Sequence, residues 1–122
     1  MAKKILVADD EPDVVRMLAM RLRANGYEVV GALDGMQAMA VARREQPDLI
    51  ILDIKMPGRD GYSVLESLRM SAKTALIPII FLSALPLAEV QAKTVELGAD
   101  GFFTKPYDSA EILATIRKMI ES

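Results

Sequence analysis

The 122-residue sequence contains no cysteine, no histidine and no tryptophan, and aromatic residues make up only 5% of it. The lack of cysteine excludes a disulfide framework and a thiolate metal site. The lack of histidine excludes imidazole acid–base catalysis and histidine-bound metals, so any metal site must use oxygen ligands, which suit hard cations. A general nucleic-acid surface is not indicated, because 15 basic and 17 acidic side chains give a net charge of −2.

The sequence also lacks long apolar runs. No stretch approaches the 18 residues that a membrane-spanning helix needs. The first apolar run, residues 5–8, ends at Asp9 and is too short for the core of a signal peptide. We therefore expect a cytoplasmic protein. The length and the 52% apolar composition suit one globular domain, which we expect residues 1–122 to form.

Short apolar runs alternate with segments of helical spacing along the whole chain. The apolar runs predict strands at residues 5–8, 27–30, 49–53, 78–82 and 101–103. The helical spacing predicts helices at about 12–24, 36–45, 62–72, 87–97 and 109–120. The first helix begins with a proline, and the last follows a motif that resembles a capping box, Asp108 to Glu111. Five such units predict an α/β fold with a parallel sheet between two layers of helices.

Polar side chains follow four of the five predicted strands. Asp9 and Asp10 follow the first strand, Asp53 ends the third, Ser83 follows the fourth, and Lys105 follows the fifth. The strands of a parallel sheet share one carboxyl edge, where open α/β sheets bind ligands. Each residue alone has an ordinary explanation, as a helix cap, a turn residue or a surface cation. Their joint position predicts a functional site.

Three carboxylates within a few ångströms repel one another, so such a site either raises a pKa or takes up a cation. Mg²⁺ suits the site best, because it accepts one or two carboxylates and keeps waters and a phosphate oxygen as further ligands. With the ammonium of Lys105 and the hydroxyl of Ser83, the cation would neutralise and orient a phosphoryl group. Asp53 is the best candidate for a nucleophile, since aspartyl phosphates are established carboxylate chemistry.

Five segments carry distinctive motifs: 5–12 (ILVADDEP), 47–53 (PDLIILD), 56–61 (MPGxxG), 81–84 (FLSA) and 98–106 (GADGFxxKP). These motifs resemble those of bacterial response-regulator receiver domains, the two-component signalling family that includes chemotaxis receivers. Any one motif is weakly specific, but five in the family's order along the whole chain are highly specific. The resemblance implies a single-domain, flavodoxin-like three-layer fold, with five helices and a five-stranded parallel sheet in the order 2-1-3-4-5.

The resemblance also implies how the acidic residues act. Mg²⁺ would be held by Asp10 and Asp53 directly, by Asp9 through water, and by the backbone carbonyl of Lys55. Asp53 would take a phosphoryl group from the phosphohistidine of a histidine kinase or a histidine phosphotransfer protein. A donor histidine on the partner agrees with a chain that has none. Such a domain would catalyse only its own phosphorylation and dephosphorylation.

The phosphate oxygens would be bound by Lys105, by Ser83 and by the backbone N–H of Ala84, and the Lys105–Pro106 bond would be a cis peptide. Ser83 and Phe102 would form the switch, with the aromatic ring turning into the space that the hydroxyl leaves. The surface of the fourth helix, fifth strand and fifth helix would then bind a downstream target or output domain. Ser83 and Phe102 stand where threonine and tyrosine are more usual, so the switch keeps its hydroxyl but loses a phenolic hydrogen bond.

Other functions stay open at this point. The chain could be the receiver of a larger, DNA-binding regulator, because a completed last helix does not decide between a free-standing and a linked domain. It could be a small Mg²⁺-dependent hydrolase, although such phosphatases want a second Asp where Lys55 stands. It could also be a receiver that never takes phosphate, against which the intact site residues argue.

Most of the methionines are predicted to fill the core or the edges of the helix packing rather than to form a binding surface. Those within predicted helices are Met17, Met20, Met36, Met39, Met70 and Met119.

Overall fold

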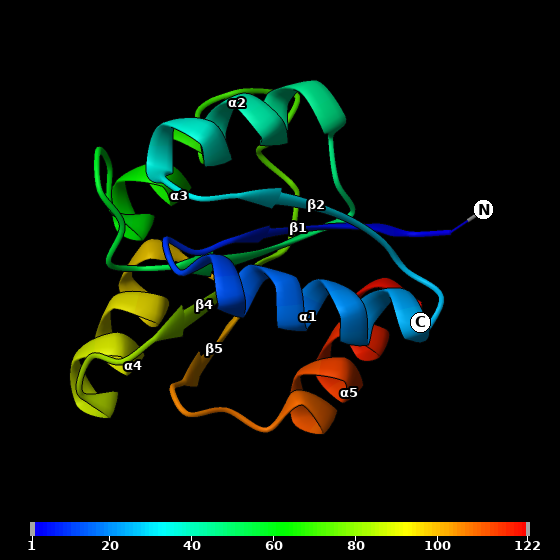
Figure 1. Cartoon of the computed structure of the whole chain (residues 1–122). Coiled ribbons are helices and arrows are strands. Elements are labelled where there is room, and N and C mark those ends of the chain that lie inside the picture. Colours follow the sequence, from blue (N-terminus) through cyan, green and yellow to red (C-terminus); the bar gives the residue numbers. More distant parts are fainter. Residues whose placement is uncertain (1, 122) are drawn as a thin grey trace.

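The computed structural model describes residues 2–121, which alternate strand and helix five times (Figure 1). This confirms the predicted α/β fold, apart from residues 1 and 122, which lie outside the described part. The strands are β1 (Lys4–Ala8), β2 (Glu28–Ala32), β3 (Leu49–Asp53), β4 (Ile79–Ser83) and β5 (Gly101–Thr104). The helices are α1 (Pro12–Ala24), α2 (Gly35–Glu45), α3 (Gly61–Arg69), α4 (Leu87–Leu97) and α5 (Ser109–Ile120).

The sheet is parallel throughout and has the predicted order β2-β1-β3-β4-β5. β3 lies at its centre, and Asp53 at the end of β3 is paired in register with Leu82 of β4. Ser83, the next residue of β4, is paired with Thr104 of β5, directly before Lys105. The register therefore brings the ends of three neighbouring strands to one edge of the sheet.

Helices cover both faces of the sheet, which explains the unbroken apolar run of β3. Residues that alternate along β3 enter two different cores, Ile50 and Leu52 on one face and Leu49 and Ile51 on the other. The first core also contains residues of α2, α3 and α4, whereas the second contains residues of α1 and α5. Figure 1 shows α2 and α3 on one side of the sheet and α1 and α5 on the other. All five residues of β3 are buried as a result.

Two predicted boundaries are wrong by more than one residue, and several others differ by one. The third helix was predicted over 62–72 but ends at Arg69, because the hydroxyl of buried Thr74 donates to the carbonyl of Leu68 at 2.6 Å. In a continued helix that carbonyl would accept the amide four residues on. The second strand was predicted over 27–30 but continues to Ala32, because Gly31 and Ala32 pair with β1 although they add little to an apolar pattern.

The start of α5 differs in detail from the predicted capping box. The carboxylate of Asp108 caps the helix, but it accepts the amide of Ala110 at 2.9 Å. The amide of Glu111, which a capping box would bring to that side chain, is bonded to the backbone carbonyl of Asp108 instead. Asp108 is therefore the N-cap as expected, but its side chain accepts the amide one residue before the one that a capping box uses.

Most of the methionines that were predicted to fill the core or the edges of the helix packing do not fill the core. Met39 is buried, but Met17, Met20, Met36 and Met70 are 60–88% exposed. On α1 the buried stripe is formed by Leu18, Ala19 and Leu22, so that its methionines fall beside the stripe rather than on it. Packing in the core therefore does not account for the exposed methionines of α1, Met17 and Met20.

Among residues 2–121, every helix is too short or too polar to cross a lipid bilayer.

Candidate functional site

Three carboxylates meet at the carboxyl edge of the sheet. Asp9 and Asp10 come directly after β1, and Asp53 is the last residue of β3. One oxygen from each lies within 4.8 Å of an oxygen of the other two. Asp9 and Asp53 are 0% and 4% exposed, while Asp10 is open to solvent. The sequence-predicted acidic cluster is therefore brought together, with two members buried and one facing water.

Lys105 supplies the balancing charge. Its ammonium lies 2.9 Å from Oδ2 of Asp9, 3.6 Å from the carboxylate of Glu11 and 3.7 Å from Oδ2 of Asp53. Burial lowers the pKa of Lys105, but the hydrogen bond to Asp9 and the negative charge of Asp53 outweigh it, and the net pKa is raised. Lys105 is therefore a permanent cation at this edge.

One ammonium does not fully relieve the repulsion among the carboxylates. Burial, and next the charge of Asp9, raise the pKa of Asp53 to about 7, although Lys105 acts in the opposite direction. A divalent cation would remove this penalty, because it favours the ionised form of each carboxylate that it contacts. The donor set, oxygen atoms only with one acidic member open to solvent, fits a hard cation such as Mg²⁺ that keeps several waters.

Ser83 ends β4 next to this cluster and is fully buried. Its Oγ accepts the backbone N–H of Leu85 at 2.9 Å, which leaves its own proton free to be donated elsewhere. The backbone N–H of Lys105 donates to the carbonyl of Ser83 at 2.7 Å and fixes the two loops to each other. The Lys105–Pro106 peptide is cis, as expected.

A cavity of about 260 Å³ opens between these loops. It is lined by residues of the loops after β1, β3, β4 and β5, namely Asp10, Glu11, Asp53, Lys55, Ala84, Leu85 and Lys105. Phe102, the other predicted switch residue, is half-buried and packs against the core formed with α2, α3 and α4. Five of the candidate site residues thus line one cavity, whereas Asp9, Ser83 and Phe102 lie outside its lining.

Sequence reasoning missed Glu11, the fourth acidic residue at the site. Its side chain is exposed and ion-paired with Lys105, and it also lines the cavity. The sequence signals for it were its position directly after Asp9 and Asp10 and its place in the matching segment 5–12. It adds negative charge at the entrance of the cavity.

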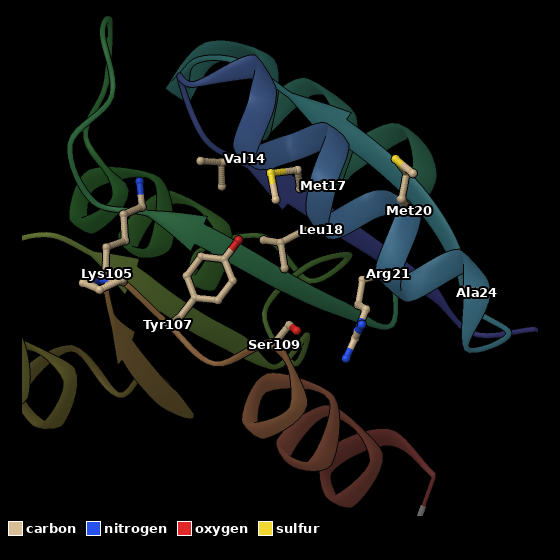
Figure 2. A pocket seen from close by; sticks show the side chains of 10 residues that line it. Val14, Met17, Leu18, Met20, Arg21, Ala24, Lys105, Tyr107 and Ser109 are labelled. Atoms are coloured by element: carbon tan, nitrogen blue, oxygen red, sulfur yellow. The ribbon is translucent and has the colours of Figure 1, made fainter.

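A second, larger hollow of about 730 Å³ lies between α1 and the segment that leads into α5 (Figure 2). Lys105 lines both hollows, so the larger one begins at the acidic site. Most of its lining is apolar, with Met17, Met20 and Tyr107 prominent in Figure 2. Burial, and then the charge of Asp9, raise the pKa of Tyr107, so that its phenol stays neutral. We call this hollow the α1–α5 groove.

Comparison with known proteins gives a consistent result. The family model of the response regulator receiver domain matches residues 5–117. The DNA-binding dual master transcriptional regulator RpaA of Synechocystis is 38% identical over 117 residues, which are 96% of this chain and 48% of RpaA. The chain spans about half, or less, of the length of such curated relatives.

Solved structures agree in fold over nearly all of the chain. The chemotaxis protein CheY4 of Vibrio cholerae is 30% identical, with a TM-score of 0.90 over 98% of this chain and 99% of CheY4. The receiver domain of the sensor histidine kinase PA1611 of Pseudomonas aeruginosa is also 30% identical, with a TM-score of 0.90 over both whole chains. That structure has a magnesium ion coordinated in its active-site cleft. With its acidic pocket of Asp9, Asp10 and Asp53, the chain therefore belongs to the response regulator receiver domains and has their CheY-like α/β fold.

Proposed function

We propose that this receiver domain accepts a phosphoryl group on Asp53 with the help of Mg²⁺ and thereby changes a surface that binds a partner. The observation that carries this proposal is the position of Asp53: a buried carboxylate with a pKa of about 7, between two other acids and 3.7 Å from the ammonium of Lys105. A bound cation would stabilise the ionised form of such a buried carboxylate, and attack on a phosphoryl group would use the negative charge of its oxygen.

Each residue of the site has its own role in this reaction. Asp10, Asp53 and the backbone carbonyl of Lys55 would hold Mg²⁺, with Asp9 acting through water, and the ion would supply positive charge for the phosphoryl oxygens. An oxygen of Asp53 attacks the phosphorus while the bond to the donor's histidine nitrogen breaks and that nitrogen keeps the electron pair. Lys105, the hydroxyl of Ser83 and the N–H of Ala84 bind the phosphoryl oxygens as charge moves onto them.

The partner on the donor side would be a histidine kinase or a histidine phosphotransfer protein, since receiver domains of this family work with such kinases. On the output side, Ser83 would exchange its present bond with Leu85 for the phosphoryl group, and Phe102 would follow inward. The surface of α4, β5 and α5 would then meet a downstream protein or an output domain. A few kcal/mol of differential binding is enough to shift such a two-state equilibrium.

A second candidate keeps the same chemistry within a larger protein. The chain matches only about half the length of relatives such as RpaA, a DNA-binding regulator, so in this second candidate the output domain would be covalently attached to the receiver. A hydrolase of external phosphate esters has less support, because Lys55 occupies the position of the second acid that such enzymes use.

The test of the proposal is uptake of phosphate from a small donor. Incubation with Mg²⁺ and acetyl phosphate is expected to add one phosphoryl group to the wild type, measured by intact-protein mass spectrometry. Asp53→Ala is expected to take up none, and chelation of Mg²⁺ with EDTA is expected to stop the reaction of the wild type. Equal labelling of Asp53→Ala, or no labelling of the wild type, would contradict the proposal, and turnover of an external phosphomonoester would favour the hydrolase.

The α1–α5 groove gives an expectation for the donor protein. A protein that brings a phosphohistidine to Asp53 must cover the surface beside Lys105, and the groove begins there with exposed methionines. The donor in this test is a phosphotransfer protein that is able to phosphorylate the wild type. Met17→Glu is expected to slow transfer from this donor about tenfold, or about 1.4 kcal/mol, because it places a charge in an apolar contact. The ratio of this rate to the acetyl phosphate rate is the quantity to measure.

Met70→Glu is the matched control for this substitution. Met70 is 88% exposed at the end of α3 and does not line the groove. Its ratio of the two rates is expected to equal that of the wild type. The same loss in both variants would show a non-specific effect of added negative charge, and no loss in Met17→Glu would exclude the groove as the docking surface of that donor.

A further inference from the structure

Arg59 lies in the loop between β3 and α3, and its guanidinium group reaches between α2 and α3. Nε and Nη2 donate to Ser63 Oγ at 2.9 and 2.5 Å, and Nη2 also donates to Ser67 Oγ at 2.6 Å. Nη1 donates to the sulfur atom of Met39 in α2 at 2.8 Å. Among residues 2–121, no carboxylate forms an ion pair with this cation. Neutral groups of two helices therefore hold the guanidinium.

The backbone around Arg59 is held against α2 as well. A Cβ atom on Gly35, the first residue of α2, would lie 2.1 Å from the carbonyl oxygen of Arg59, so only glycine permits this approach. The N–H of Gly35 donates to the carbonyl of Pro57 in the same loop at 3.3 Å. The loop and the first turn of α2 thus lie in direct backbone contact, and the Arg59 side chain extends this contact along both helices.

The loop has other anchors as well: the side chains of Ile54 and Met56 pack in the core formed with α2, α3 and α4, and the N–H of Gly61 donates to the carbonyl of Ile54 at 2.7 Å. Ile54 and Met56 are buried, but Lys55, Pro57 and Gly58 are exposed. Lys55 lines the cavity that also contains Asp53. The position of the loop therefore decides where the backbone carbonyl of Lys55 lies relative to the acidic residues.

We propose that Arg59 is a positioning residue for the cation site: it fixes the β3–α3 loop to α2 and α3, and thereby holds the Lys55 carbonyl in place for Mg²⁺. This inference rests on the proposed Mg²⁺-dependent function and adds to it a residue that does not line the cavity. Outer groups that orient a metal ligand commonly affect metal affinity by about 10-fold to 100-fold.

The sign of the effect separates positioning from simple electrostatics. Loss of a positive charge should by itself strengthen the binding of a cation, whereas loss of a positioning contact should weaken it. Arg59→Ala is therefore expected to raise the Kd for Mg²⁺ by about tenfold, measured by isothermal titration calorimetry. Hydrogen exchange of the backbone amides of residues 54–56 and 58–60 is expected to become faster in the same variant. Arg44→Ala, which removes an exposed cation of α2 that is ion-paired with Glu45, is the charge-matched control and is expected to change neither quantity.

Removal of the acceptors tests the same contact without a change of charge. Ser63→Ala combined with Ser67→Ala is expected to weaken Mg²⁺ binding in the same direction, and adding both to Arg59→Ala is expected to cause no further loss, because the contact is already gone. Thermal unfolding of each variant shows whether it folds. If Arg59→Ala does not fold, the double serine variant provides the test instead. An unchanged Mg²⁺ Kd and unchanged loop exchange in a folded Arg59→Ala protein, or full additivity with the serine variant, would overturn the inference.

The outcomes also separate this inference from the proposed function. A wild type that binds Mg²⁺ but accepts no phosphoryl group would contradict the phosphorylation of Asp53, while the Mg²⁺ and exchange measurements would still decide the role of Arg59. A wild type that is phosphorylated normally, together with an Arg59→Ala variant indistinguishable from it in Mg²⁺ affinity and loop exchange, would remove only the role of Arg59.

Discussion

Lys105→Met is expected to slow phosphoryl uptake from acetyl phosphate by about 100-fold or more, the usual effect of removing one preorganised group that stabilises developing charge. The ammonium is the only cation among the described residues that forms ion pairs with Asp9 and Asp53, at 2.9 and 3.7 Å. A methionine fills a similar volume but offers no charge to the phosphoryl oxygens. The measurement is the initial rate of mass increase at saturating Mg²⁺.

A second measurement on the same variant distinguishes this effect from misfolding. The ammonium of Lys105 forms an ion pair with Asp9 and therefore competes with any metal cation for the acidic cluster. Lys105→Met is therefore expected to bind Mg²⁺ at least as tightly as the wild type while it accepts phosphate more slowly. A misfolded protein would lose both properties, and uptake within about threefold of the wild-type rate would contradict the assigned role. Lys73→Met, which removes an exposed cation from the α3–β4 loop, is expected to behave as the wild type.

Asp53→Asn is expected to stabilise the metal-free protein, and to do so more at pH 8 than at pH 5. The pKa of Asp53 is raised from 3.8 to about 7 by burial and by Asp9, so between these values the folded state binds more protons than the unfolded state. The free energy of unfolding of the wild type therefore falls as the pH rises through this window. The full shift corresponds to an upper bound of about 4 kcal/mol, which solvent in the cavity reduces to about 2 kcal/mol.

Asparagine does not ionise, so the variant does not lose this free energy. The difference in the free energy of unfolding between variant and wild type is expected to grow from under about 1 kcal/mol at pH 5 to about 2 kcal/mol at pH 8. Urea denaturation in EDTA at both pH values measures it. Excess Mg²⁺ at pH 8 should reduce the difference, because the ion stabilises the folded wild type. A difference that is the same at both pH values would show that Asp53 is not the group whose ionisation destabilises the fold.

Most of the fold could be predicted because the chain's local patterns agree with its tertiary structure. The apolar run before Asp53 predicts a strand buried on both faces, and β3 is buried on both faces by helices. The boundaries that failed depend on contacts outside the local pattern. α3 ends where Thr74 takes over a carbonyl of Leu68, and β2 extends through Gly31 because β1 pairs with it.

The methionines of α1 mark the limit of pattern reasoning on the same helix. The periodicity of α1 predicts an apolar stripe, but it does not fix which border residues the neighbouring elements cover. Leu18 and Leu22 pack into the core formed with α5, whereas Met17 and Met20 remain exposed and line the α1–α5 groove. Which side chains become surface was decided by the position of α5, an element about 90 residues further along the chain.

The sequence by itself determined the strand–helix order, the lack of any histidine or cysteine ligand, and the set of residues at the strand ends, because these follow from local patterns and from a shared carboxyl edge. Only the tertiary structure decided how those residues are charged and held. It pairs Lys105 first with Asp9 rather than with Asp53, and it adds Glu11 to the entrance. It also raises the pKa of Asp53 through burial and a neighbouring acid, and it inserts Arg59 between two helices. Such distances and desolvation arise only when segments remote in sequence pack together, which is why no local pattern contains them.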